Sequence, residues 1–422
     1  MRTRGMRTTN MKTAGMSSAT PRNAPPLLKS LCPEARLLFL AARPYGADEH
    51  AAEIADLAAQ ALDWNVFCEL ARLHRVLPLA HATLAEYARQ HVPKRAYAYL
   101  SAQTTMTTMR NEANLVELMR LDSRMREVGV EALHYKGATT ALRMYPALGS
   151  RTFHDMDFIV SPGQVQRVCT QLEADGYQNK QQPTDRERRI FEKELKEYLY
   201  LKDGFNIEPH WRFTPRRYAF DLELDAIRRR DVKLDDHAGL LAPGPEDSLV
   251  LMMLVGASGF WKRLQMLSDI AACTHTFSTL DWHWLRAEMQ RLRARRILLL
   301  SALLSHELCA AVIPDDLLAE ARQHATVVRM ARTVVEKLAS VDRCRKASAH
   351  PPRQFQRLLW QMRDTLGDRL VYLARTTTTA SHVHARRMPL SPQLHFLYRG
   401  LVPLHDYLAI PLSRHLRRLK AG

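Results

Sequence analysis

The chain has 422 residues, 46% of them hydrophobic, which is enough for two or three domains with real cores. Its formal net charge of +17 attracts anionic partners such as nucleic acid, nucleotides or an anionic membrane face, although a solvated basic surface explains it equally well. Six scattered cysteines without a CxxC pair argue against a disulfide framework or a zinc site and fit a reducing cytoplasm, where we expect the protein to be.

The basic excess lies at the two ends of the chain. Residues 1–25 carry five basic and no acidic side chains, and we predict that they form a disordered basic N-terminus. Residues 343–422 carry 15 basic and three acidic side chains and are predicted to form a basic helical tail. The most apolar stretches, near residues 247–261 and 296–313, are too short or too interrupted to span a membrane, so no transmembrane segment is predicted.

Residues 26–129 form a predicted helical N-terminal segment, because their apolar residues recur at three- and four-residue spacing. The last helix of this segment is expected to run from about residue 94 to 128 and to end at Gly129. A helical C-terminal domain is predicted over residues 241–342, between the central unit and the basic tail.

The period changes in residues 130–240, which we predict to be a small α/β core. Short strands are expected at "EALHYKG" (131–137) and "DMDFIVS" (155–161), with a helix in 163–177 between turn residues. Two further strands in 197–213, separated by Gly204, are expected to form a hairpin. The predicted fold class is therefore α+β, with a small mixed-sheet core flanked by N- and C-terminal helical segments.

Two carboxylates stand one residue apart in the otherwise apolar stretch "RTFHDMDFIV". Because strand side chains alternate, Asp155 and Asp157 project from the same face of the predicted strand. Two ionised carboxylates this close repel each other unless a cation lies between them, and a Mg²⁺ ion with substrate phosphates suits such a pair. The motif alone is a weak signal, since a structural network of the two aspartates with Arg151 and backbone amides also explains it.

Three further features strengthen the metal interpretation. Lys136 and Gly137 directly follow a predicted strand, where the glycine lets backbone amides approach a phosphate and the lysine supplies charge. Arg151 leads into the Asp-x-Asp strand. Glu208 supplies a third carboxylate on another strand, with His210 on the same face. Since the intervening proline at 209 cannot donate to a β-ladder, Glu208 is expected on an edge strand or near a strand end.

This arrangement resembles the DNA polymerase β-like nucleotidyltransferase superfamily, and more closely its bacterial branch of uncharacterised nucleotidyltransferases. That branch is similar in its Lys-Gly turn, Tyr-Pro, Arg before Asp-x-Asp and Gly-Tyr after the next helix, all within residues 133–177. The stretches "IEPHWRF", "FWKRLQMLSDIA" and "DWNVFCELARLHRVLPL" match further segments of the family, so the resemblance covers about residues 60–400.

The resemblance implies roles for single residues. Asp155, Asp157 and Glu208 would be the catalytic carboxylates and the ligands of two Mg²⁺ ions, with Mn²⁺ as a possible substitute. The NTP phosphates would be bound by residues of the turn and of the two strands: Lys136, Gly137, Arg151 and His210, with Lys262 or Arg263 as further candidates. One departure from the family is that Ala138 follows Gly137 where a glycine or serine is usual, so a hydroxyl donor is missing, and Thr139 is a candidate replacement.

The resulting prediction is a Mg²⁺-dependent nucleotidyltransferase that moves a nucleoside monophosphate from an NTP to an acceptor hydroxyl. The acceptor is unidentified; RNA, protein or a polysaccharide precursor would suit the basic C-terminus. A metal-dependent glycosyltransferase is one alternative, but it requires alternating strands and helices before the Asp-x-Asp motif. The other is an inactive RNA- or partner-binding relative, which a separation of Glu208 from both aspartates by more than about 8 Å would favour. No histidine cluster predicts a metal site.

Overall fold

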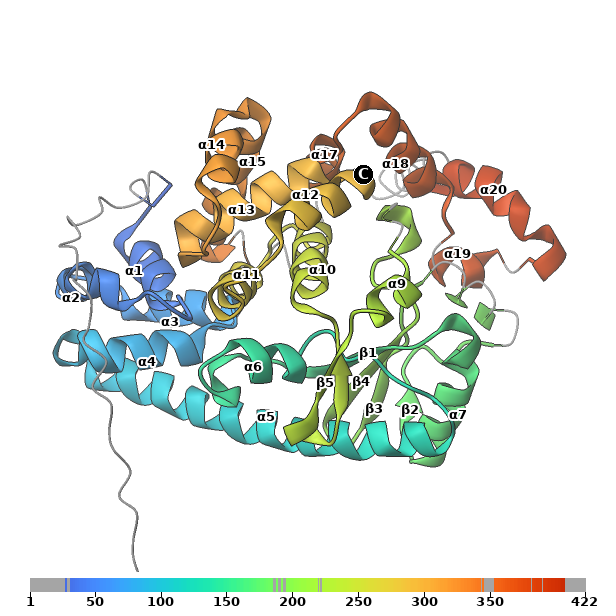
Figure 1. Ribbon diagram of the computed structural model, residues 1–422, viewed down its shortest axis with the longest axis horizontal. Helices are drawn as coiled ribbons and strands as arrows, with labels where there is room; N and C mark the ends of the chain where they lie inside the picture. Colours follow the sequence, from blue (N-terminus) through green and yellow to red (C-terminus); the bar gives the residue numbers. More distant parts are fainter. Residues whose placement is uncertain are drawn as a thin grey trace, which may run out of the picture.

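A computed structural model of the chain describes residues 27–28, 31–184, 187–188, 191–192, 195–218, 220, 222–342, 344, 353–380, 382–388 and 390–406. The predicted disordered segment 1–25 and parts of the predicted tail lie outside these residues. Figure 1 shows a small β-sheet on one side, with helices from both ends of the chain on the other. The predicted mixed α+β class is confirmed.

The N-terminal part is helical as predicted. Its helices are α1 (Pro33–Ala41), α2 (Ala51–Ala58), α3 (Trp64–Leu73), α4 (Leu77–Tyr87) and α5 (Lys94–Glu127). The long helix α5 ends one residue before the predicted position, and Gly129 follows with a φ of +70°, a conformation that glycine adopts without steric cost. Figure 1 shows α5 running beneath the whole molecule, from α4 to the sheet.

The sheet contains β1 (Asp155–Ile159), β2 (Gln178–Asn179), β3 (Tyr200–Lys202) and β4 (Phe205–His210), in the order β1-β4-β3-β2. β1 pairs with β4 in parallel, and the other pairs are antiparallel, which confirms the predicted hairpin of β3 and β4. A separate antiparallel pair is formed by β5 (Val232–Leu234) and β6 (Leu240–Ala242). β4 is an interior strand, so the edge position considered for Glu208 is wrong, whereas the position near a strand end is correct.

The strand predicted at residues 131–137 is not formed. Leu133 makes only isolated bridges, one to Ile159 of β1 and one to Leu241 of β6. The chain turns at Gly137 into helix α6 (Ala138–Met144), so the segment divides its backbone hydrogen bonds between two neighbours and builds no continuous ladder with either.

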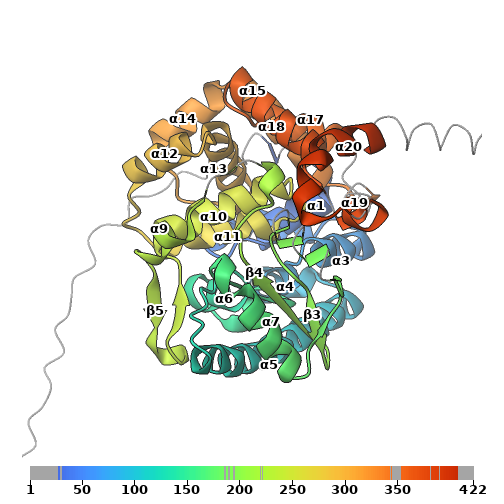
Figure 2. The same ribbon diagram turned by 90° about the vertical axis from the view of Figure 1, so that its right-hand side faces the viewer.

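Opposite faces of the sheet have different surroundings. Met156, Phe158 and Ile207 project toward α5 and α7 (Val165–Ala174) and share a hydrophobic cluster with them. The other face, which carries Asp155 and Asp157, lies toward the C-terminal helices α10 (Pro245–Ser258) and α11 (Gln265–Thr276). Figure 2 shows this sandwich from the side, with the sheet between α7 and the α10–α11 pair.

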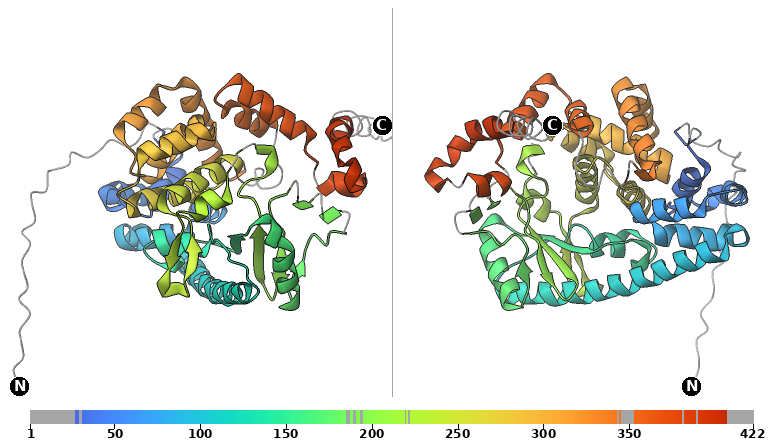
Figure 3. Two further views of the ribbon diagram at one scale, coloured as in Figure 1. Left: turned by 45° about the vertical axis from the view of Figure 1, so that its right-hand side comes forward. Right: turned by 180° about the vertical axis from the view of Figure 1, so that it is seen from behind.

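The remaining helices follow α9 (Leu224–Arg228) and α10–α11: α12 (Trp282–Arg291), α13 (Arg295–Cys309), α14 (Asp315–Gln323), α15 (Ala325–Leu338), α17 (Arg353–Gln361), α18 (Leu366–Thr378), α19 (His382–Arg387) and α20 (Tyr398–Leu404). Helices α10, α11, α13 and α15 share one hydrophobic core with α1–α4. The two views in Figure 3 show the blue N-terminal helices next to the yellow and orange helices of the C-terminal part. Among the residues described, no helix combines the length and apolar character needed to cross a membrane.

Candidate active site

The register of the parallel pair β1–β4 brings the predicted carboxylates together. Asp157 lies directly opposite Glu208, and adjacent strands are about 4.8 Å apart, so their side chains emerge as neighbours on one face. Ligand atoms of Asp157, Glu208 and His210 all lie within 4.8 Å of one another. Asp155 lies opposite Asn206, whose side-chain amide donates to it at 3.2 Å. We call Asp155, Asp157 and Glu208 the carboxylate cluster.

His210 lies behind this cluster. Its side chain is fully buried, and Nε2 is 3.0 Å from Oδ1 of Asp157. Nδ1 faces the hydroxyl of Tyr135 and Oε2 of Glu197, each at 3.0 Å. His210 does not belong to the residues that line the adjacent cavity, so its geometry is that of a residue that positions Asp157 rather than one that contacts phosphate.

Charge at the cluster is unevenly distributed. Burial acts to raise the pKa of Asp157, but the ammonium of Lys136 at 3.1 Å and the hydrogen bond from His210 outweigh it and hold that pKa well below its usual range. Burial, reinforced by the charges of Asp157 and Glu197, raises the pKa of Glu208. Of these two carboxylates, Asp157 holds its negative charge more firmly, and Glu208 takes up a proton more readily.

A cavity of about 290 Å³ opens over the carboxylate cluster, and basic side chains from just after α3 and from the segment between α10 and α11 also line it. We call Arg75, Lys262 and Arg263 the cationic wall. Burial and the charge of Arg263 lower the pKa of Arg75 to about 10, and burial with the charges of Arg263 and Arg75 lowers that of Lys262. Groups of like charge crowded in this way gain free energy when an anion binds between them.

Gly137 has the backbone geometry that the sequence predicts for a turn at the site. Its φ is +57°, and a Cβ atom there would lie 3.1 Å from the carbonyl oxygen of Asp155, so glycine allows β1 to begin beside the turn. The hydroxyl of Thr139, the candidate replacement for the missing donor, instead donates to the carbonyl oxygens of His134 and Lys136. Thr140, the next residue, lines the cavity.

Arg151 lines the cavity. Its guanidinium donates to Asp269 and not to the aspartates of the Asp-x-Asp motif that the sequence suggested as its partners. Nε and Nη2 donate to the two carboxylate oxygens of Asp269 on α11, at 2.7 and 2.8 Å, and the Tyr145 hydroxyl donates to the same carboxylate at 2.7 Å. Asp269 therefore forms a buried ion pair with Arg151. Trp261, at the start of the same region, is fully buried.

Arg75 was not predicted from the sequence as a residue of the site. It directly follows His74 at the end of α3, about 80 residues before the Asp-x-Asp motif, and has a φ of +59°. Periodicity treats it as one more polar residue at a helix end. The signal that would have found it is its place inside "ARLHRVLPL", a stretch already noted for its resemblance to the family.

Comparison with known protein families agrees with this geometry. A family model described as uncharacterised nucleotidyltransferase matches residues 60–310, which is more than half of the chain. The chain belongs to this family. Every residue of the candidate site named above lies inside the matched segment, and α14 to α20 lie beyond it. No curated protein and no solved structure matches the chain.

Proposed function

We propose that the protein transfers a nucleoside monophosphate from an NTP to an acceptor hydroxyl at the carboxylate cluster. The observation that carries this proposal is the position of the ionised Asp157 beside Glu208, across a cavity from the cationic wall. A triphosphate in this cavity carries negative charge that the cationic wall can neutralise directly. Next to the carboxylate cluster its charge must be neutralised by bound metal ions. The family membership supports the same class of reaction.

The donor set suits divalent ions that prefer oxygen. Asp155, Asp157 and Glu208 offer carboxylate oxygens toward one cavity, and Mg²⁺ binds one or two carboxylates together with substrate phosphates. Two Mg²⁺ ions bound there, or Mn²⁺ in their place, would neutralise the phosphates and align the attacking oxygen with the leaving group.

The chain's own residues divide the remaining work. Arg75, Lys262 and Arg263 hold the β- and γ-phosphates, and Gly137 leaves room for the phosphates next to the turn. The acceptor oxygen attacks the α-phosphorus, the bond from that phosphorus to the bridging oxygen breaks, and pyrophosphate leaves. Glu208, whose pKa is raised, takes the proton of the acceptor hydroxyl. Most of the rate enhancement then comes from positioning and charge neutralisation.

The glycosyltransferase alternative finds no support in the architecture. It requires a Rossmann-like series of strands before the Asp-x-Asp motif, and the described residues ahead of β1 form helices with a single bridging residue, Leu133. A Glu208 far from both aspartates would favour an inactive binding protein. In the structure, the Glu208 carboxylate lies within 4.8 Å of the Asp157 carboxylate. RNA, protein or a polysaccharide precursor remain the acceptors that fit the basic C-terminus.

The test uses nucleotide binding first, because binding needs no acceptor. The purified protein is titrated with each of the four NTPs in the presence of Mg²⁺ or of EDTA. We expect binding that requires Mg²⁺ and that Asp157→Asn weakens at least about tenfold. The control Asp203→Asn changes an exposed aspartate in the β3–β4 turn and leaves binding intact.

Transfer is then followed with NTPs labelled at the α-phosphate, by locating the label in co-purified RNA, protein or small molecules. Binding that is equal in EDTA, or equal in wild type and Asp157→Asn, would refute the proposed site. Binding without transfer of the α-label to any of these acceptors, and without release of pyrophosphate, would instead favour the inactive binding protein.

A further inference from the structure

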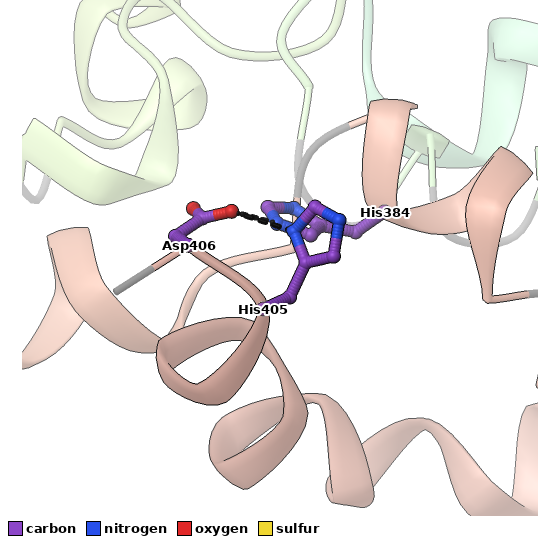
Figure 4. Close-up of side chains that lie close together, drawn as sticks. All are labelled: His384, His405 and Asp406. Atoms are coloured by element: carbon purple, nitrogen blue, oxygen red, sulfur yellow. Dashed lines mark hydrogen bonds and ion pairs between the residues drawn. The ribbon is translucent and has the colours of Figure 1, made fainter. Parts of the chain in front are cut away.

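A second group of potential metal ligands lies far along the chain from the active site. His384 belongs to α19, and His405 and Asp406 directly follow α20. Figure 4 shows both imidazole rings turned toward the carboxylate of Asp406. Nε2 of His384 and Nδ1 of His405 each lie 2.8 Å from Oδ1 of Asp406, and one ligand atom from each residue lies within 4.8 Å of the other two.

Burial makes this group more than a surface contact. The side chain of His384 is 6% exposed and that of His405 is 15% exposed, whereas Asp406 is 39% exposed and opens toward solvent. The two rings meet edge to face with centroids 5.1 Å apart. Two imidazoles therefore converge on one carboxylate from different segments, and both present a ring nitrogen to the same point.

We propose that His384, His405 and Asp406 bind a divalent transition-metal ion of the Zn²⁺ type. Two imidazole nitrogens and one carboxylate oxygen are ligands that zinc binds at about 2.0–2.2 Å, and in a tetrahedral site such ligands are about 3.3 Å apart. The two nitrogen–oxygen separations of 2.8 Å need to open by only a few tenths of an ångström. A fourth position is left on the exposed side of Asp406 for a water molecule.

Binding has a definite proton balance. Each imidazole nitrogen that now faces Asp406 must offer a lone pair to the metal, so a proton on it moves to the other ring nitrogen or leaves to solvent.

The ion would join α19 to the end of α20 within the C-terminal segment 382–406, and both helices contact the region of the sheet. Tyr398 and Val402 of α20 are buried in the hydrophobic cluster that contains Tyr198 and Trp211, next to β3 and β4. Arg386 of α19 donates to the carbonyl oxygen of Gln181, which follows β2. A metal that joins α19 to the end of α20 therefore holds both contacts in place at once.

The alternative is a triad held by hydrogen bonds alone, and one substitution separates the two. Asp406→Asn keeps a side-chain oxygen that accepts hydrogen bonds from both imidazoles, so a hydrogen-bonded triad survives it. Replacing the carboxylate by a neutral amide removes the anionic ligand, so a metal site does not survive it. His384→Ala removes a nitrogen ligand and affects both.

Cobalt(II) is the probe, because in a tetrahedral site with nitrogen ligands it absorbs visible light and replaces zinc. The metal-free full-length protein is titrated with Co²⁺ in excess Mg²⁺, which occupies oxygen-rich sites and competes weakly for imidazole. We expect one Co²⁺ per chain, displaced by Zn²⁺, with affinity reduced at least tenfold in His384→Ala and Asp406→Asn. The matched control is His91→Ala, which changes an exposed histidine between α4 and α5 and should bind as the wild type does.

Limited proteolysis then asks whether the ion holds the segment. Zn²⁺ should slow cleavage within residues 382–406 severalfold in the wild type and have no effect in Asp406→Asn. Absence of the cobalt absorption, or equal binding by wild type and Asp406→Asn, overturns the proposal. Loss of the signal in Asp157→Ala instead would place the ion at the carboxylate cluster and also overturn it. The proposal does not depend on nucleotidyl transfer, so either can fail alone.

Discussion

Asp157 is held from two sides, by the ammonium of Lys136 and by Nε2 of His210. His210 is in turn held by Tyr135 and Glu197, so its ring cannot rotate without breaking contacts on both nitrogens. Burial and Lys196 act to lower the pKa of His210, but Glu197 and Asp157 outweigh them and raise it. The contacts of Lys136 and His210 therefore hold the Asp157 carboxylate in place for a metal.

Replacing His210 tests whether it positions Asp157 or contacts phosphate. Glutamine keeps a hydrogen-bond donor but not the ring, so we expect His210→Gln to raise the Mg²⁺ concentration needed for half-maximal NTP binding by about tenfold, a typical effect for a partner of a metal ligand. At saturating Mg²⁺ the NTP affinity should match the wild type. The reverse result, an unchanged Mg²⁺ requirement with weaker NTP binding, would restore the phosphate contact predicted from the sequence.

At the scale of elements, the loop 259–264 between α10 and α11 presents two of the three basic residues of the cationic wall. Its backbone is strained, because Phe260 and Trp261 have φ values of +57° and +40°, which residues other than glycine rarely adopt. Trp261 fixes the loop by inserting into the helical core. Lys337 donates to the carbonyl oxygen of Phe260, and His74 accepts from the backbone N–H of Leu264.

Gly256 on α10 is the residue that lets Trp261 pack. A Cβ atom at this position would lie 2.6 Å from the indole Nε1 of Trp261, a distance that forces the ring to move. We expect Gly256→Ala to displace the loop and weaken Mg²⁺-dependent NTP binding about tenfold or more, since Lys262 and Arg263 move with it. Titration calorimetry measures the effect.

The control for Gly256→Ala is Gly163→Ala, where an added Cβ atom meets nothing within 4 Å. Circular dichroism shows whether each variant keeps its helices. Unchanged NTP binding in a well-folded Gly256→Ala protein would separate the loop from the nucleotide site.

Lys337 makes the stability of this region depend on pH. Burial, aided by the charge of Lys262 and opposed by Cys344, lowers its pKa from the ordinary 10.5 to about 7. Between these two values the unfolded chain binds more protons than the folded one, so the free energy of unfolding rises with pH. Below pH 7 both states are protonated and this contribution becomes constant.

We therefore expect the wild type to gain about 1 kcal/mol per pH unit between about pH 7.5 and 9.5, relative to Lys337→Met. Urea unfolding at several pH values gives the difference, in which titrations common to both proteins cancel. Parallel pH profiles for the two proteins would mean that Lys337 stays protonated in the fold.

Local pattern predicted the elements that carry their own signal. The apolar spacing and Gly129 located α5 to within a residue, and the alternation around Gly204 located the β3–β4 hairpin. The same alternation failed at residues 131–137, because what decides a strand is a neighbour to pair with, and Leu133 finds only single partners.

The site was predicted in part for the same reason. Its carboxylates lie on adjacent strands whose register follows from alternation, so Asp157 and Glu208 were found. Arg75 and Asp269 reach the cavity through the packing of helices that are distant in sequence, and no local pattern records that packing. The cluster of His384, His405 and Asp406 has no ligand spacing that would mark it, because its members come from two segments about 20 residues apart.

At the scale of the molecule, the active site lies where two hydrophobic clusters meet. One is formed by α1–α4 with the C-terminal helices, and the other by the sheet with α7 and part of α5. Arg151 lies just ahead of β1, which belongs to the second cluster, and its partner Asp269 lies on α11, which belongs to the first. The pair is nearly buried, with side chains 10% and 11% exposed, so this contact fixes how the carboxylate cluster faces the cationic wall.

Removing one partner of this pair should therefore destabilise the protein and loosen the connection between the two clusters. In Arg151→Met, the buried carboxylate of Asp269 loses its cationic partner and keeps the hydrogen bond from the Tyr145 hydroxyl. An uncompensated buried charge lowers the free energy of unfolding by about 3–5 kcal/mol. We expect the cluster built on the sheet to melt first in calorimetry, as a separate transition. Arg72→Met, which removes an exposed pair with Glu69, should cost less than about 1 kcal/mol.

The double variant Arg151→Met/Asp269→Leu separates loss of the pair from the cost of a stranded charge. Because both charges are gone, we expect it to be more stable than Arg151→Met alone, by about 2 kcal/mol or more. NTP binding should stay weak in both variants, since neither retains the contact that orients α11 and the loop before it against β1. Recovery of stability together with full NTP affinity would mean that packing alone aligns the two halves of the site.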